Sequence, residues 1–87
     1  MNNPPISAVE NDAKAILRML VAEKGLEAGE RMPNALILAY VHDLGMAGIR
    51  RDEALTFAGD QAWIESCDNG LSVVTEAGYD VGIADKT

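Results

Sequence analysis

The amino-acid sequence predicts a single α+β domain that is mostly helical, with a three-helix core followed by a C-terminal β-hairpin. The chain has 87 residues, of which 48% are hydrophobic, and this suits one sizeable core. Apolar residues recur at helical spacing in the first part of the chain, and glycines stand where those helices should end. After them, the segment WIESCDNGLSVVTE places two strand-like stretches on either side of Asp-Asn-Gly, a turn sequence of β-hairpins.

The first helix is predicted to start at a capping box, in which Ser7 and Glu10 satisfy the free amides of a helix start, and to end before Gly25. Apolar residues between these points lie three and four positions apart, so they share one face of a helix that should pack on the core. This face consists of Ala13, Ile16, Leu17, Leu20 and Val21. Residues 1–6, which include two prolines, are predicted to form a flexible arm.

The second helix is predicted in ALILAYVHDL, between Pro33 and Gly45. This segment is apolar nearly all round, and the pattern by itself fits a buried helix or a buried strand. Its alanine and leucine content, and the glycine that ends it, favour the helix. Pro33 suits a first helical turn, and the connector before it, LEAGERMPN, has room for one or two residues of edge strand.

The third helix is predicted from about Arg50 to Ala62, after a glycine-bearing turn. Asp52 and Glu53 belong to its first turn, where the helix dipole favours negative charge. Its inner stripe is predicted to consist of Leu55, Ala58 and Ala62, with Ala54 and Phe57 beside it.

The hairpin is predicted to cover one end of the helical core. Its strands begin at Trp63 and Leu71, and Asn69 and Gly70 in the turn tolerate a positive φ. The side chains expected to face the core are those of Trp63, Ile64, Leu71 and Val73. Thr75 is predicted to cap a final short helix, and residues 81–87 are predicted to form a flexible tail.

The formal net charge of −7 lies entirely in the second part of the chain. Up to Arg51 there are six acidic and six basic residues, so this part is neutral. From Asp52 onward there are eight acidic residues and one base, Lys86. An acidic surface repels phosphate backbones and attracts basic partners, so the charge favours protein partners over nucleic acids.

The residue types that carry chemistry form no catalytic pattern, so we expect no enzyme, no cofactor and no metal site. His42 is predicted to be a helix-end residue, Cys67 an inert thiol beside an acidic residue, and Trp63 a core or core-edge residue. A single cysteine cannot form an internal disulfide, which favours a cytoplasmic protein. The start of the chain shows no basic and apolar signal pattern, and no apolar run approaches membrane-spanning length, so no membrane partner is expected.

The order of helices followed by a hairpin resembles a winged helix-turn-helix domain. AWIE, a turn and LSVVTEAGYD are similar to the family's ending, in which a GWI strand precedes the wing and an LTxxG strand follows it. Ala62 and Val74 replace the glycine and leucine usual there. The architecture covers residues 7–80, and the resemblance implies that the third helix enters a DNA major groove. The residues that would contact DNA are Arg31, Arg50 and Arg51.

The charge of the third helix and the wing opposes that DNA-binding role, because both carry acidic side chains where a DNA reader needs basic ones. We therefore expect a small, non-catalytic regulatory module that associates with proteins, with binding to double-stranded DNA as the alternative. The partner is expected to be basic, and the apolar second helix supports a homodimer. The candidate protein-contact residues are Tyr40, Asp60, Glu65 and Asp68.

Overall fold

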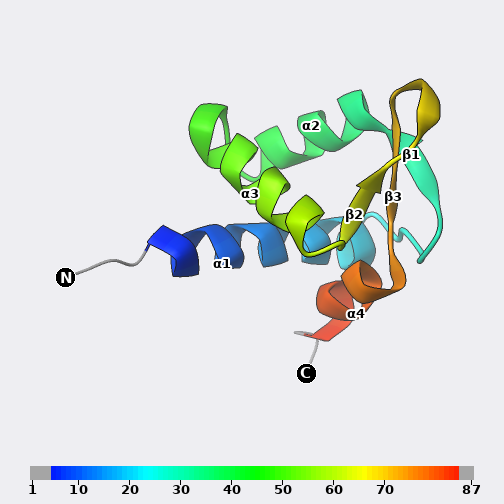
Figure 1. Cartoon of the computed structure of the whole chain (residues 1–87), viewed down its shortest axis with the longest axis horizontal. Coiled ribbons are helices and arrows are strands. Elements are labelled where there is room, and N and C mark those ends of the chain that lie inside the picture. The colour runs from blue at the N-terminus through cyan, green and yellow to red at the C-terminus, as the bar shows by residue number, and fades with distance from the viewer. Residues whose placement is uncertain (1–4, 85–87) are drawn as a thin grey trace.

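The structure, a computed structural model, describes residues 5–84 and confirms the α+β class. Within these residues there are four α-helices and a three-stranded antiparallel sheet, which lies at one side of the molecule (Figure 1). The elements in chain order are α1 (Pro5–Arg18), a π-helical turn (Met19–Glu23), β1 (Arg31–Pro33), α2 (Asn34–Asp43), α3 (Gly48–Asp60), β2 (Ile64–Ser66), a tight turn (Asp68–Gly70), β3 (Leu71–Val74) and α4 (Glu76–Ala84).

Helix α1 and its π-helical extension form the centre of the molecule, with α3 and α4 packed against them. The predicted inner face of this helix is confirmed, since all five of its residues are buried. The predicted start is wrong: the helix begins at Pro5, so Ser7 belongs to its first turns instead of preceding them. Proline fits a first helical position because its missing N–H would have no helical partner there. Residues 1–4 of the predicted arm lie outside the described part of the chain.

The ends of the first two helices agree with the sequence. Gly25 and Gly45 follow them with φ angles of 75° and 88°, which glycine adopts without strain. The predicted edge strand is present as β1. Pro33, predicted in the first turn of the second helix, is instead the last residue of β1 and precedes α2 with no side-chain capping bond. Burial of α2 differs from the apolar pattern, because only Ile37 and Val41 are buried along this helix. One face of the helix packs on the core, Tyr40 is half-buried beside it, and the remaining alanines and leucines are exposed.

Strand β3 lies in the middle of the sheet, antiparallel to β1 on one side and β2 on the other. The predicted core-facing residues of this strand, Leu71 and Val73, are only half-buried, and the prediction is wrong. Ser72 and Val74, which are 6% and 1% exposed, face the core instead. Alternation along a strand separates two sets of residues but does not say which set faces inward. The hydroxyl of Ser72 donates a hydrogen bond to Oδ1 of Asn34, so its burial leaves no polar group unpaired.

The turn between β2 and β3 is confirmed at Asp-Asn-Gly. Asn69 and Gly70 have φ angles of 66° and 72°, and the N–H of Cys67 donates to the carbonyl of Leu71 at 2.7 Å. Thr75 caps α4 as predicted, because its Oγ1 accepts a hydrogen bond from the N–H of Gly78 at 3.0 Å. The helix continues to Ala84 and so extends beyond the predicted boundary at residue 80; residues 85–87 lie outside the described part.

Helix α3 starts and ends two residues earlier than predicted, and Ala62 is exposed instead of lining its inner stripe. The helix ends in a Schellman motif: the N–H of Trp63 donates to the carbonyl of Ala58 at 2.9 Å, and that of Ala62 to Gly59 at 3.0 Å. Ala62 has a φ of 60°, the left-handed conformation that this motif requires. The rings of Phe57 and Trp63 meet edge to face, 5.7 Å between centroids, and complete the motif's apolar contact.

Ala62→Gly should therefore increase the free energy of unfolding by about 1 kcal/mol, because a Cβ is strained at this φ and glycine removes the strain. Denaturant unfolding followed by circular dichroism measures the change. Gly45 ends α2 in the same motif and gives the matched control. Gly45→Ala should decrease the free energy of unfolding by a similar amount, and two variants that shift it in the same direction would contradict backbone strain as the cause.

Candidate functional site

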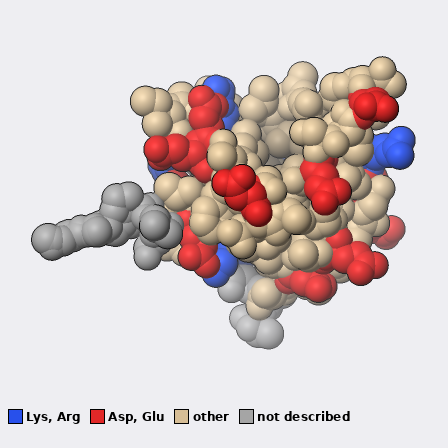
Figure 2. All heavy atoms as spheres, viewed as in Figure 1, with Lys and Arg blue, Asp and Glu red and all other residues tan. Residues whose placement is uncertain are grey.

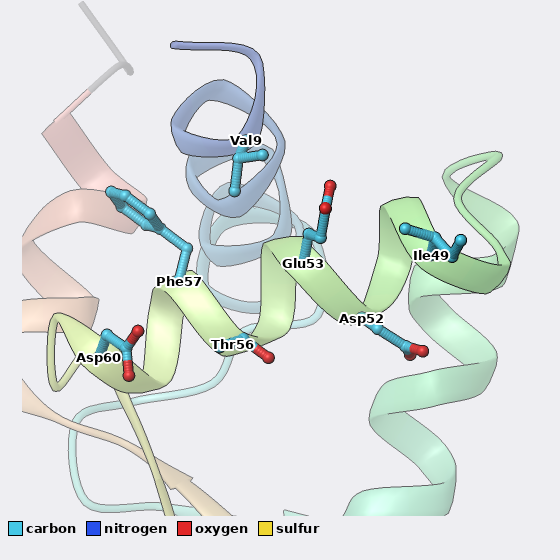
Figure 3. A pocket seen from close by; sticks show the side chains of 7 residues that line it. All are labelled: Val9, Ile49, Asp52, Glu53, Thr56, Phe57 and Asp60. Carbon is cyan, nitrogen blue, oxygen red and sulfur yellow. The ribbon is translucent and has the colours of Figure 1, made fainter. Parts of the chain in front are cut away.

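The outward face of α3 carries two rows of side chains. Ile49, Glu53 and Phe57 form the row next to α1, and Asp52, Thr56 and Asp60 form the parallel row on the other side (Figure 3). Each row repeats at intervals of four residues, which keeps its members on one side of a helix. The buried side of the same helix is made of Ala54 and Ala58, small residues that let α3 lie close to α1.

Together with Val9 of α1, these rows line an open groove of about 560 Å³, which we call the α1–α3 groove. Its apolar side chains are Val9, Ile49 and Phe57. Ile49 is 76% exposed, the most exposed large apolar side chain in the described part of the chain. Three carboxylates from α3 also line the groove: Glu53 lies between Ile49 and Phe57, and Asp52 and Asp60 lie on the parallel row. The groove thus combines apolar contact area with a negatively charged rim.

One end of α3 is fixed to α1 by an ion pair. Arg50 donates from Nε and from a terminal nitrogen to the two carboxylate oxygens of Asp12, at 2.8 and 2.9 Å. This two-pronged contact lowers the pKa of Asp12, chiefly through the hydrogen bond and also through the charge of Arg50. The Arg50 guanidinium is consequently directed to Asp12 of α1 and links the start of α3 to α1.

The three arginines predicted to contact DNA do not gather on one face. Arg51 pairs with its neighbour Asp52 at 3.0 Å, and Arg50 is held by Asp12. Arg31 is on β1 at the edge of the sheet, well apart from the first turn of α3 (Figure 1). In the sheet, Arg31 and Glu65 both lie opposite Val73, on the strands that flank it. On the face that carries α3, acidic side chains are widespread and basic ones are sparse (Figure 2).

The predicted protein-contact residues are also distributed over several elements. Asp60 lines the α1–α3 groove, whereas Glu65 is exposed on β2 and Asp68 is exposed in the turn. Tyr40 is half-buried on α2, with Nζ of Lys24 at 4.3 Å from its ring centroid. Asp60 alone among them belongs to the groove.

The sequence prediction missed the apolar part of the groove. The exposure of Ile49 could have been suspected from the sequence, because Ile49 is not part of the inner stripe of α3. On its own face of the helix, Phe57 is its one apolar neighbour. The contribution of Val9 was not detectable, because it depends on how α1 and α3 cross.

A second, smaller groove of about 320 Å³ runs between α2, α3 and the sheet, where Ile37, Leu38 and Ile64 meet the hydrogen-bonded Ser72.

The residues predicted to be chemically inert are placed at the surface or at the edge of the core. Cys67 is a half-exposed free thiol, His42 is exposed at the end of α2, and Trp63 is half-buried at the core edge. Among the described residues, no cluster of three or more His, Cys, Asp or Glu side chains is arranged to hold a metal ion. No helix in residues 5–84 has both the length and the apolar character needed to cross a membrane.

Comparison of the chain with protein-family models, with curated proteins and with solved structures gives no match.

Proposed function

We propose that this chain is a non-catalytic regulatory module that associates with other proteins through the α1–α3 groove, on a winged-helix frame. The element order supports the frame: a helix, a short edge strand, two helices and a hairpin, with the last strand in the middle of the sheet. In such a frame α3 is the second helix of the helix-turn-helix unit and the β2–β3 hairpin is the wing.

The observation that carries the proposal is the chemistry of the outward face of α3. A helix that reads DNA needs cations to replace the counterions of the phosphates, and its face is polar. Here the face carries the apolar side chains of Ile49 and Phe57 and the acidic ones of Asp52, Glu53 and Asp60. Exposed apolar side chains with a polar rim are typical of protein-binding surfaces. DNA binding through Arg50 and Arg51 is the second candidate, supported by the position of both residues in the first turns of α3.

A gel-shift experiment at low salt separates these two candidates. With mixed duplex DNA and micromolar protein, we expect no retardation, because the two arginines are paired with carboxylates and surrounded by further acids. Retardation that is lost in an Arg50→Ala, Arg51→Ala variant would favour DNA binding instead. The matched control removes two cations elsewhere, Lys14→Ala and Lys24→Ala, so that a loss caused only by net charge is recognised.

A homodimer is part of the same proposal, with α2 as the contact surface. Leu36 and Leu38 are exposed on this helix, at 38% and 40%, although both are large and apolar. The helix carries no charge from Asn34 to Val41, so two acidic copies can approach each other there with little repulsion. This contact leaves the α1–α3 groove of each copy open to a partner.

A further inference from the structure

We infer that the partner of the α1–α3 groove is a basic amphipathic helix of a second protein. This inference rests on the proposed function and adds the chemistry and the shape of what the groove binds. The helix would place its apolar side chains on Val9, Ile49 and Phe57 and its lysines or arginines against Asp52, Glu53 and Asp60.

The shape of the groove fits a helix better than an extended peptide. An extended peptide gains affinity by adding a strand to a free sheet edge, but the groove is formed by two helices and offers no strand. The row from Ile49 to Phe57 covers eight residue steps of α3, or about 12 Å. A partner helix of about three turns spans this length and presents apolar residues at i, i+3, i+4 and i+7.

The negative charge of the groove favours a partner that carries positive charge. Asp52, Glu53 and Asp60 line the groove together with its apolar side chains. Of the nearby cations, Arg50 is bound to Asp12 and Arg51 to Asp52. An acidic helix would meet like charges along the whole rim, which weakens binding and slows association. A basic helix gains attraction chiefly at Glu53 and Asp60, since Asp52 is already paired with Arg51, and it is drawn in by the net charge of −7.

Three synthetic peptides of about 14 residues test the inference on the full chain. They share the same leucine positions, at i, i+3, i+4 and i+7, and carry lysine, glutamine or glutamate at the remaining positions. Amide chemical shifts of the isotope-labelled protein are followed during titration with each peptide. We expect the Leu/Lys peptide to shift the amides of Val9, Ile49 and Phe57 and to bind about tenfold or more tightly than the Leu/Gln peptide.

Variants of the protein distinguish the groove from general attraction to an acidic chain. Ile49→Glu adds a negative charge but removes the apolar contact, so a loss of about tenfold in affinity for the Leu/Lys peptide cannot come from charge. Ile83→Glu is the matched control, because Ile83 is an exposed isoleucine of α4 outside the groove. It should leave the affinity unchanged.

Two triple variants with equal net charge test the rim. Neutralising the rim through Asp52→Asn, Glu53→Gln and Asp60→Asn should weaken binding of the Leu/Lys peptide more than neutralising exposed acids elsewhere. The matched triple is Glu65→Gln, Asp68→Asn and Asp80→Asn.

The outcomes separate the two levels of the proposal. Equal weakening by both triples, or equal binding of the Leu/Gln and Leu/Lys peptides at the groove, overturns the basic partner and leaves the groove as a protein-binding site. No shift at the groove with any of the three peptides overturns protein association through the groove itself.

Discussion

Replacement of Gly78 by alanine should decrease the free energy of unfolding by about 3 kcal/mol, one of the largest effects expected for any single methyl group in this chain. A Cβ at this position would lie 2.1 Å from the carbonyl oxygen of Trp63 and 3.1 Å from Cδ1 of Leu17. The first contact is with backbone, which cannot rotate away, so α4 must move off the end of β2 and off α1. Thermal unfolding followed by circular dichroism should show a midpoint lowered by about 12 °C or more.

Gly82, one turn further along α4, should respond in the same direction. A Cβ there would lie 2.6 Å from two carbons of Val21 and 2.8 Å from the carbonyl oxygen of Leu17. Gly59 is the matched control, because it is also helical, has an ordinary φ and has no atom within 4 Å of an added Cβ. Gly59→Ala should stabilise the protein by about 0.5–1 kcal/mol. Equal effects at Gly78 and Gly59 would contradict the close packing of α4 on α1.

Replacement of Thr75 by valine should cost about 1–2 kcal/mol, because one hydroxyl serves two structural elements. Its oxygen accepts the hydrogen bond from the N–H of Gly78, and its proton is donated to the carbonyl of Ala62 at 2.6 Å, with the carbonyl of Trp63 at 3.2 Å. Valine has nearly the same shape as threonine but forms neither bond. Urea unfolding of the purified variant measures the loss.

Thr75→Ser is the control for this prediction, since it keeps the hydroxyl and removes only a methyl group. We expect it to retain most of the stability of the wild-type protein. If Thr75→Ser lowers the free energy of unfolding and Thr75→Val does not, the methyl group and not the hydroxyl is the stabilising part of Thr75. The result also bears on α3, because the acceptor carbonyl belongs to Ala62, the residue that ends its Schellman motif.

The predictions for Gly78, Gly82 and Thr75 concern how α4 packs on the rest of the domain. Gly78 and Gly82 bring α4 close to α1 and to its π-helical extension, and Thr75 joins the start of α4 to the end of α3. The groove is formed by α1 and α3, and α4 packs directly against α1, one of its two walls. Destabilising α4 should therefore affect the groove without changing a residue that lines it.

Local features of the fold were predictable because their causes are local. Gly25, Gly45 and Asn69-Gly70 stand where the backbone needs a positive φ, and that requirement is visible in the residue type. The inner stripe of α1 follows from helical spacing, and the cap at Thr75 follows from a hydroxyl before a helical segment. The start of α1 was misplaced because Ser7 and Pro5 are both acceptable near a helix start, and their side chains alone do not rank them.

Features that depend on which elements meet were not predictable in the same way. On the inward face of β3, Val74 is buried in the core and Ser72 pairs with Asn34, which is 38 residues earlier in the chain. The partner of Arg50 is likewise 38 residues away, at Asp12, so an arginine that looked available for DNA is bound within the molecule. The residues next to Ser72 and Arg50 in the sequence do not indicate these partners.

By itself, the sequence determined the helical segments, the turn of the hairpin and the concentration of negative charge after Arg51, because spacing, turn chemistry and charge are properties of neighbouring residues. The tertiary structure was needed to show that Val9, Ile49 and Phe57 share a groove, that the groove is also lined by acidic side chains, and that Arg50 is bound to Asp12 of α1. The physical reason is the crossing of α1 and α3. Packing through Ala54 and Ala58 sets that crossing, and it brings together side chains that are far apart in the chain.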